Sequence, residues 1–336
     1  RECYSQMTPL QETLSHAEKA IFDIVMHRSS GESLVPMREV LYNTYEMIEE
    51  LSKLKGKISG VPTGFQALDH LLTGMHAGEL ILIGARPSMG KTSFAINIAS
   101  HAAFMAGKTV AFFSLEMSAE KIVERLIASR AYVDNKKIQT GRLFGNDLLN
   151  VDKAIKEIAQ TELYFDDTPN SRLSDIIAKA RTLKNKVPNL GLIVIDYLGR
   201  IRHFDKSDAS ARQQEVSLIS GELKSLARNL NVPVIVLCQL NRNTESGENK
   251  VPELSNLRES GSIEQDADIV LLLYRQDYYT DLGQNVKKKS WAKDKGGAPE
   301  PPKVEMTPEQ KEKSGDISEV QVLVAKNRNG NIGKGR

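Results

Sequence analysis

The chain has 336 residues, a formal net charge of +2 and only 2 cysteines. This length suffices for one large domain or two small ones with a sizeable apolar core. The near-neutral charge excludes a protein that coats nucleic acid over its whole surface, although a short basic loop could still bind it locally. Cys3 and Cys238 offer neither a disulfide framework nor a metal-ligand cluster, so we expect a reducing, cytoplasmic environment.

The lengths of the apolar runs show whether a segment could span a membrane. The longest runs, Val234 to Cys238 and Ile269 to Tyr274, are far shorter than the roughly 20 residues that a membrane-spanning helix needs. We therefore expect no membrane partner. The first residues, Arg-Glu-Cys-Tyr, include neither an initiator methionine nor an apolar signal segment. We therefore expect the sequence to be part of a longer chain.

Two helical patterns precede the first predicted strand. Residues 10–27 place apolar side chains at alternating spacings of four and three, which predicts a narrow apolar stripe along a helix. That stripe suits either docking on another helix or packing in the core of the same domain. Residues 37–54 form a second amphipathic pattern, and the glycines and proline between Lys55 and Gly64 predict a linker or turn.

From Glu79 onward, short apolar runs alternate with longer helical patterns. The runs are Leu80–Gly84, Thr109–Ser114, Leu163–Phe165, Leu190–Asp196, Val232–Gln239, Ile269–Tyr274 and Val320–Lys326. This alternation predicts a three-layered α/β fold, with a mainly parallel twisted sheet flanked by helices.

Residues 283–318 differ from the rest in being rich in Lys, Glu, Pro and Gly. Such a segment buries too little apolar surface to order itself, so we predict a flexible charged insertion between two strands. The lysines around Trp291 leave a DNA-binding role open beside that of a solvated loop.

Residues 84–92 read Gly-Ala-Arg-Pro-Ser-Met-Gly-Lys-Thr and lie between an apolar strand and a helical pattern. This is the order of a phosphate-binding P-loop, whose backbone N–H groups surround phosphates. Lys91 would reach the β and γ phosphates of ATP, and Thr92 would ligate Mg²⁺. Ala85 stands where the pattern usually has its first glycine, which is a departure from it.

Five further polar residues lie at the ends of predicted strands or just after them. Asp196 would organise Mg²⁺, Glu116 would orient or activate water, and Gln239 would contact the γ phosphate. Their alternative interpretations are a turn residue, a surface residue at a helix start and a strand-end cap. Lys326 and Arg328 follow the last strand and could reach a neighbour's nucleotide, although the sequence does not show that they act in trans.

Several motifs in one order resemble the DnaB-type replicative helicases. They are Ala85–Thr92, Ser114–Ser118, Ile195–Leu198, Arg212–Val216, Arg258–Asp268 and Lys326–Gly330. The resemblance runs from about Leu10 to the C-terminus, interrupted by the insertion. Family members commonly have alanine at the first P-loop position, so Ala85 becomes a point of resemblance.

The resemblance implies a RecA-like ATPase core that assembles into a hexameric ring around single-stranded DNA. It implies nucleotide-binding residues at Ser88, Gly90, Lys91, Thr92, Ser93, Arg125 and Asp196, with Mg²⁺ at Thr92 and Asp196. It implies catalytic roles for Glu116 as base, for Gln239 as γ-phosphate sensor and for Lys91. Lys326 and Arg328 would also act in catalysis, inserted into the adjacent subunit's site. It implies DNA-backbone contacts at Arg258, Glu259 and Gly261, although Arg258 and Glu259 could instead form a surface ion pair.

The resemblance also implies the domain organisation and the partners. Residues 1–56 would be a helical linker region that docks on the neighbouring subunit, and residues 57–336 the RecA-like ATPase and helicase domain. The partners would be single-stranded DNA and further copies of this chain. Primase and a loader would bind through regions partly absent here. The place of action would be close to the nucleoid. Residues 197–203 are more basic than the family pattern and would add charge to the channel.

Two other functions fit part of the same pattern. One is another RecA-like DNA-dependent ATPase, such as a recombinase or a clock-type phosphotransfer protein, which would share the ATPase core but would not unwind a fork. The other is a non-catalytic ring protein that only binds nucleotide, and Glu116 and Asp196 argue against it.

Overall fold

The computed structural model describes residues 35–53, 58–169, 171–201, 212–240, 251–275 and 319–335. The chain divides into two compact units, Arg1–Lys57 and Ile58–Arg336. The expected helix over residues 10–27 and the insertion 283–318 lie outside the described residues, as do Arg202 and His203 of the basic segment. Among the described helices, none is long and apolar enough to cross a bilayer.

Helix α2, Met37–Lys53, is the described part of the first unit. It coincides with the amphipathic pattern predicted over residues 37–54. Glu39 in its first turn and Lys53 in its last turn complement the helix dipole. Its apolar side chains, including Leu41 and Ile48, are exposed.

The second unit is built around an eight-stranded sheet with the order β3-β2-β4-β5-β1-β6-β7-β8. Its strands are β1 (Leu80–Ala85), β2 (Thr109–Ser114), β3 (Leu163–Asp166), β4 (Leu190–Asp196), β5 (Val234–Gln239), β6 (Ile269–Tyr274), β7 (Gln321–Asn327) and β8 (Gly333–Gly335). The strands from β3 to β6 in this order pair in parallel, and β7 and β8 add antiparallel. The mainly parallel α/β class is confirmed. Strand β8 was not predicted, because Gly-Lys-Gly has no apolar pattern and becomes a strand only through pairing with β7.

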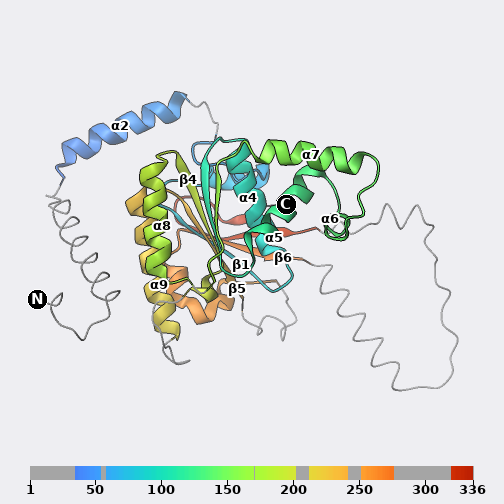
Figure 1. The fold of residues 1–336 in the computed structure, drawn as a ribbon. Helices are drawn as coiled ribbons and strands as arrows, with labels where there is room; N and C mark the ends of the chain where they lie inside the picture. Colours follow the sequence, from blue (N-terminus) through green and yellow to red (C-terminus); the bar gives the residue numbers. More distant parts are fainter. Residues whose placement is uncertain are drawn as a thin grey trace, which may run out of the picture. The chain divides into compact units, whose positions relative to one another are not determined.

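Helices cover both faces of the sheet (Figure 1). On one face lie α8 (Leu173–Lys186) and α9 (Arg212–Leu230), and on the other α4 (Lys91–Phe104) and α5 (Ala119–Ala131). Successive residues of a strand point to opposite faces of the sheet. Leu82 packs with α8 and α9 on one face, and Ile83 with α4 and α5 on the other. A strand covered on both faces is apolar throughout, and all six residues of β1 are buried.

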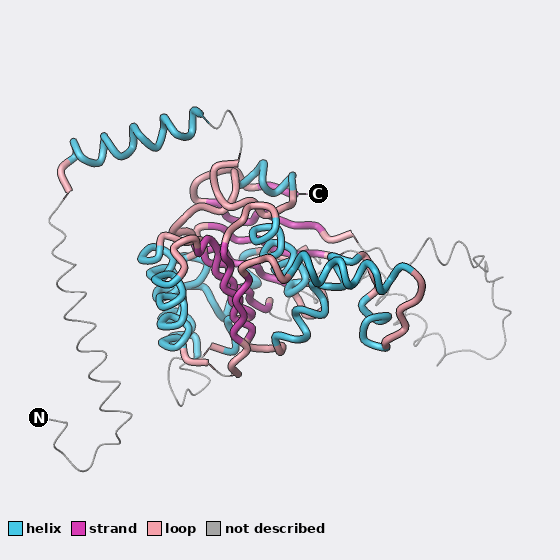
Figure 2. The backbone as a smooth tube through the Cα atoms, turned by 45° about the horizontal axis from the view of Figure 1, so that its top comes forward, coloured by secondary structure: helices cyan, strands magenta, loops and turns pink. Residues whose placement is uncertain are grey.

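The remaining helices and 3₁₀ turns lie around this sheet (Figure 2). They are α3 (Gln66–Leu72), α6 (Asn135–Thr140), α7 (Asn146–Ile158), α10 (Gly261–Asp266) and the 3₁₀ turns η2 (Leu198–Arg200) and η4 (Leu254–Ser260). Helices α5, α6 and α7 share a small satellite core that contains Ala131, Val133 and Ala154.

The segment before α3, which we expected to be a linker or turn, belongs to the second unit. The buried carboxylate of Asp69 accepts hydrogen bonds from the Thr63 backbone N–H at 2.7 Å, the Thr63 hydroxyl at 2.8 Å and the Gly64 N–H at 3.1 Å. The Phe65 ring stacks on Phe94 of α4, with their centroids 4.9 Å apart. This segment is therefore fixed to the helix that follows the loop after β1.

Candidate functional site

Four parallel strands end side by side at the carboxyl edge of the sheet. Ala85 of β1 is in register with Gln239 of β5, and Ser114 of β2 with Asp196 of β4. Loops that follow neighbouring parallel strands emerge on the same side, which is where α/β sheets bind ligands. The loop after β1 and the predicted residues of β2, β4 and β5 therefore meet there.

The loop between β1 and α4 holds its backbone in a left-handed conformation at two positions. Ser88 has φ 66° and Gly90 has φ 86°. A Cβ at Gly90 would meet no atom within 4 Å, so glycine is favoured there by its conformational freedom and not by lack of space. Helix α4 begins at Lys91, and the N–H groups of its first turn lack acceptors within the helix, which suits an anion.

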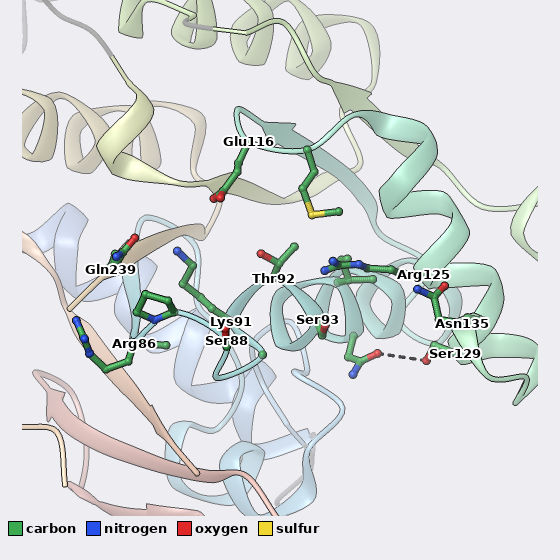
Figure 3. A pocket seen from close by; sticks show the side chains of 17 residues that line it. Arg86, Ser88, Lys91, Thr92, Ser93, Glu116, Arg125, Ser129, Asn135 and Gln239 are labelled. Atoms are coloured by element: carbon green, nitrogen blue, oxygen red, sulfur yellow. Dashed lines mark hydrogen bonds between the residues drawn. The ribbon is translucent and has the colours of Figure 1, made fainter. Parts of the chain in front are cut away.

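A cavity of about 790 Å³ opens over this loop (Figure 3). This volume lies in the range of about 300–1,000 Å³ that is typical of small-molecule sites. The predicted residues that line it are Ser88, Gly90, Lys91, Thr92, Ser93, Glu116, Arg125 and Gln239. The structure thus brings together eight predicted residues from α4, α5, β5 and the loops after β1 and β2.

Asp196 lies at the base of this site with 0% of its surface exposed. Its Oδ2 accepts a hydrogen bond from the Thr92 hydroxyl at 2.6 Å, and its Oδ1 lies 4.0 Å from Lys91 Nζ. Burial raises the pKa of the Asp196 carboxyl, while the Thr92 hydrogen bond and the Lys91 charge act in the opposite direction. Folding therefore places the Asp196 carboxylate, which can carry a charge, where water solvates it poorly.

The environment of Asp196 fits a divalent cation. Its buried Oδ1 has no hydrogen-bond partner among the described residues, and the Thr92 hydroxyl lies next to the same carboxylate. Carboxylate and hydroxyl oxygens are the ligands that Mg²⁺ prefers. Thr92 and Asp196 are therefore the residues that could hold it.

Glu116, Arg125 and Gln239 face the cavity from three directions (Figure 3). Glu116 follows β2, Arg125 lies on α5, and Gln239 is the last residue of β5. Glu116 and Gln239 are exposed. Their acid and amide groups can therefore contact a ligand or water above Lys91.

Four polar lining residues were not predicted: Arg86, Asn97, Ser129 and Asn135. Arg86 donates to the backbone oxygen of Leu240 at 2.9 Å, and the Ser129 hydroxyl to Asn97 Oδ1 at 3.4 Å. Asn97 could have been noticed as a polar residue among the apolar positions of α4. Ser129 and Asn135 give no such signal, because they reach the cavity only through the packing of α5 against α4 and of α6 against α5.

Lys326 and Arg328 do not reach this cavity within the same chain. Antiparallel pairing sets Asn327 against Ile269, which pairs in turn with Ile81 near the beginning of β1. The two basic residues therefore lie toward the amino edge of the parallel strands, opposite the P-loop. Burial lowers the pKa of Lys326, and the nearby Arg328 charge lowers it further.

The same two residues bind the end of α10. Lys326 Nζ donates to the Glu264 backbone oxygen at 2.5 Å, and Arg328 Nη2 donates to the Gln265 backbone oxygen. Arg328 Nη1 also lies 3.4 Å from Asp268 Oδ1. They satisfy carbonyl groups that a helix end leaves without partners.

The predicted DNA-contact residues lie at the junction of η4 and α10. Arg258 and Glu259 belong to η4, and Gly261 begins α10. Their side chains lie outside the described part of the structure, so these contacts stay predictions. Helix α10 itself is held to α9 by a hydrogen bond from the Ser220 hydroxyl to Asp266.

Comparison with known families gives the chain its place. The family described as DnaB-like helicase C-terminal domain matches residues 60–336. The chain belongs to this family. The resemblance seen in the sequence motifs is thereby confirmed, and the Lys91 loop, Asp196 and Lys326 all fall within the matched part of this DnaB-like domain.

Known replicative helicases are similar to this DnaB-like chain. It is 44% identical over 282 residues to the replicative DNA helicase DnaC of Bacillus subtilis, a match that covers 84% of this chain and 62% of the relative. It is 38% identical over 330 residues to the replicative DNA helicase DnaB of Haemophilus influenzae, covering 96% and 63%. The chain therefore spans less than two thirds of the length of these relatives.

Two solved structures share the fold at 34% identity. An ATPase domain superposes with a TM-score of 0.74 and covers 90% of this chain and 94% of that one. A DnaB-like replicative helicase, described with its interactions with primase, superposes with a TM-score of 0.71 and covers 94% and 68%.

Proposed function

We propose that this chain is the motor of a replicative ring helicase, in which ATP hydrolysis drives movement along single-stranded DNA and separation of the duplex. The observation behind this proposal is that Lys91, Thr92 and Glu116 line one cavity of nucleotide size, while buried Asp196 contacts Thr92 and Lys91. The similarity to replicative helicases of two bacteria supports the same activity. It gives no support to the recombinase or clock-type alternative.

ATP would bind with its phosphates along the loop after β1 and the first turn of α4. Backbone N–H groups from Ser88 to Ser93 and the Lys91 ammonium would hold the phosphate oxygens, and Arg125 would flank the nucleotide. Thr92 and Asp196 would hold Mg²⁺, which when bound offsets the negative charge of the β and γ phosphates.

Hydrolysis would begin with Glu116 as general base. Its carboxylate would take a proton from a water whose oxygen bonds to the γ phosphorus while the bond to the ADP oxygen breaks. Lys91 would stabilise the charge on the transferred group, and Gln239 would respond to its departure. Lys326 and Arg328 of an adjacent subunit would complete the site, which their distance from the chain's own P-loop supports.

DNA and protein partners follow from the ring arrangement. Arg258, Glu259 and Gly261 would contact the backbone of single-stranded DNA in the channel, with Arg258 supplying charge and Gly261 close approach. Residues 1–56 would dock on the next copy and help close a homohexamer. We also propose primase and a loader as partners, no membrane partner, and a place of action in the cytoplasm at the nucleoid.

The test is ATP hydrolysis with and without single-stranded DNA, on protein whose oligomeric state is measured by light scattering. We expect hydrolysis by a hexamer that DNA stimulates, and a fall of about 10²–10⁴-fold in kcat for Glu116→Gln because the general base is lost. Binding of a fluorescent ATP analogue should persist in that variant. A monomer whose hydrolysis ignores both DNA and the substitution would contradict the proposal.

A further inference from the structure

Lys91 lies between two different partners, the Asp196 carboxylate and the Tyr197 ring. Its Nζ is 4.0 Å from Asp196 Oδ1 and 4.6 Å from the centre of the Tyr197 ring. Other lysine–carboxylate pairs in the described part of the chain close to between 2.5 and 3.0 Å. Opposite charges attract more strongly when buried, and Asp196 is fully buried, so the open distance here needs a cause.

The Tyr197 ring supplies such a cause. The face of an aromatic ring attracts a cation, and an ammonium placed over it gains energy without reaching a carboxylate. Tyr197 is half-buried and packs against the apolar layer that contains α4 and α5, which restricts the movement of its ring. Lys91 lines the cavity, whereas Tyr197 is not part of the lining and contacts the lysine through its ring.

Gly199 leaves the room that this ring occupies. A Cβ at Gly199 would lie 2.5 Å from Cε2 of Tyr197 and 3.2 Å from its Cδ2. Any larger residue at this position would push the ring away from its place. The position of the ring over Lys91 therefore depends on a second residue, Gly199, which is not part of the cavity lining.

We propose that Tyr197 is a positioning residue whose ring holds the Lys91 ammonium off the Asp196 carboxylate. The lysine then stays available to the phosphates, and Asp196 Oδ1 stays available to Mg²⁺. Without the ring, the ammonium closes on the carboxylate, and the pair must separate before nucleotide and metal bind. This inference rests on the proposed nucleotide site and deepens it.

The first test compares Tyr197→Leu with Tyr197→Phe in the full chain. Leucine keeps apolar bulk but removes the ring, whereas phenylalanine keeps it. For Tyr197→Leu we expect the KM for ATP and the Mg²⁺ concentration for half-maximal hydrolysis to rise about three- to tenfold. We expect kcat to stay within about twofold, because bound phosphates have already drawn Lys91 from Asp196. For Tyr197→Phe we expect both quantities to equal those of the wild type.

Two further experiments use a second variant and a readout other than activity. Gly199→Ala leaves the tyrosine in place but displaces its ring, and should raise the same two quantities. A crystal structure of nucleotide-free Tyr197→Leu should show Lys91 Nζ within about 2.8 Å of Asp196 Oδ1. Thermal unfolding of each variant shows whether its fold is retained.

Several outcomes would overturn the inference. Equal KM values for Tyr197→Leu and Tyr197→Phe would do so, as would a fall in kcat with an unchanged KM, or a Lys91–Asp196 distance that stays near 4.0 Å. If the wild-type protein showed no hydrolysis that depends on Lys91, the proposed function would fail instead. The crystallographic distance would still test the contact itself.

Discussion

A buried carboxylate lies at each edge of the sheet, and the two carboxylates differ in their hydrogen-bond and ion-pair partners. At the carboxyl edge, Asp196 Oδ1 has no hydrogen-bond partner among the described residues, and Lys91 stands 4.0 Å away. At the amino edge, Asp268 Oδ2 accepts from the Leu80 N–H at 2.8 Å and from Lys224 Nζ at 2.5 Å. Both carboxylates are nearly inaccessible, with 0% and 6% exposed. The partners of the two carboxylates, and not their burial, therefore distinguish Asp196, which we propose to bind a ligand, from Asp268, which holds segments of the fold together.

The amino edge also holds the basic residues that we propose to act on a neighbour. The Arg328 backbone N–H donates to the Asp268 backbone oxygen at 2.9 Å, and its guanidinium to the Gln265 backbone oxygen. Arg328 is thus held by contacts within its own chain. Because Gln265 belongs to α10, which begins at the proposed DNA-contact residue Gly261, the position of Arg328 depends on that helix.

The largest expected effect concerns Arg328, through which we propose that the amino edge of one subunit acts on the nucleotide site of the next. Arg328→Ala should lower kcat by about 10³-fold or more while largely sparing nucleotide binding, because an arginine that stabilises transition-state charge is lost. Steady-state hydrolysis and analogue binding check this. Lys156→Ala, which removes only an exposed pair with Asp152 on α7, serves as the surface control and should leave both unchanged. Equal loss of binding and turnover would count against the assignment.

Mixing variants decides whether Arg328 acts in trans. Lys91→Ala removes the pocket function and Arg328→Ala the finger, so each is inactive alone. If the finger acts across a head-to-tail interface, about a quarter of the interfaces in an equal mixture combine one intact pocket with one intact finger. We expect activity to return on mixing, and a mixture as inactive as its components would show that the residue acts within its own chain.

The intermediate effect concerns stability and compares the two carboxylates directly. Asp268→Asn should lower the free energy of unfolding by about 2–4 kcal/mol, because Lys224 loses its charged partner. Asp196→Asn should change it by less than about 1 kcal/mol, because an amide keeps the Thr92 hydrogen bond and removes a poorly solvated charge. Urea unfolding measures both. A larger loss for Asp196→Asn than for Asp268→Asn would invert the comparison of the two edges.

The smallest effect is a pH dependence at the amino edge. The hydrogen bond to Glu79 raises the pKa of His76 above 6.5, although burial opposes it. A raised folded pKa adds stability that is complete below 6.5, the unfolded value, and is lost as the pH rises through the folded value. The wild type should therefore exceed His76→Gln by about 0.5–1 kcal/mol in acid, a modest figure because the pair is partly exposed.

Unfolding at a series of pH values tests this prediction. The advantage of the wild type should be greatest below pH 6.5 and should shrink as the pH rises. Glu79 keeps its hydrogen bond from the His76 backbone N–H at 2.8 Å in either protein, so the side-chain contribution is isolated. A pH-independent difference would show that His76 stabilises only by packing.

Local pattern was enough to predict most of this molecule. Seven strands were predicted because each contains a short apolar run, although β3 is only partly buried, and the residues around Lys91 because the P-loop is contiguous in sequence. The parallel order then made it possible to predict that Glu116, Asp196 and Gln239 lie at or just after the ends of strands near that loop. The roles of these residues stay predictions.

Tertiary structure alone decided the rest, because it depends on register and packing between distant segments. The antiparallel pairing of β6 and β7 moves Lys326 and Arg328 away from their own P-loop, and no local pattern encodes that register. The cavity contribution of Asn135 requires α6 to pack beside α5. The contact of the Tyr197 ring with Lys91 joins residues far apart in sequence, because β1 and β4 are brought to either side of β5 only when the sheet forms.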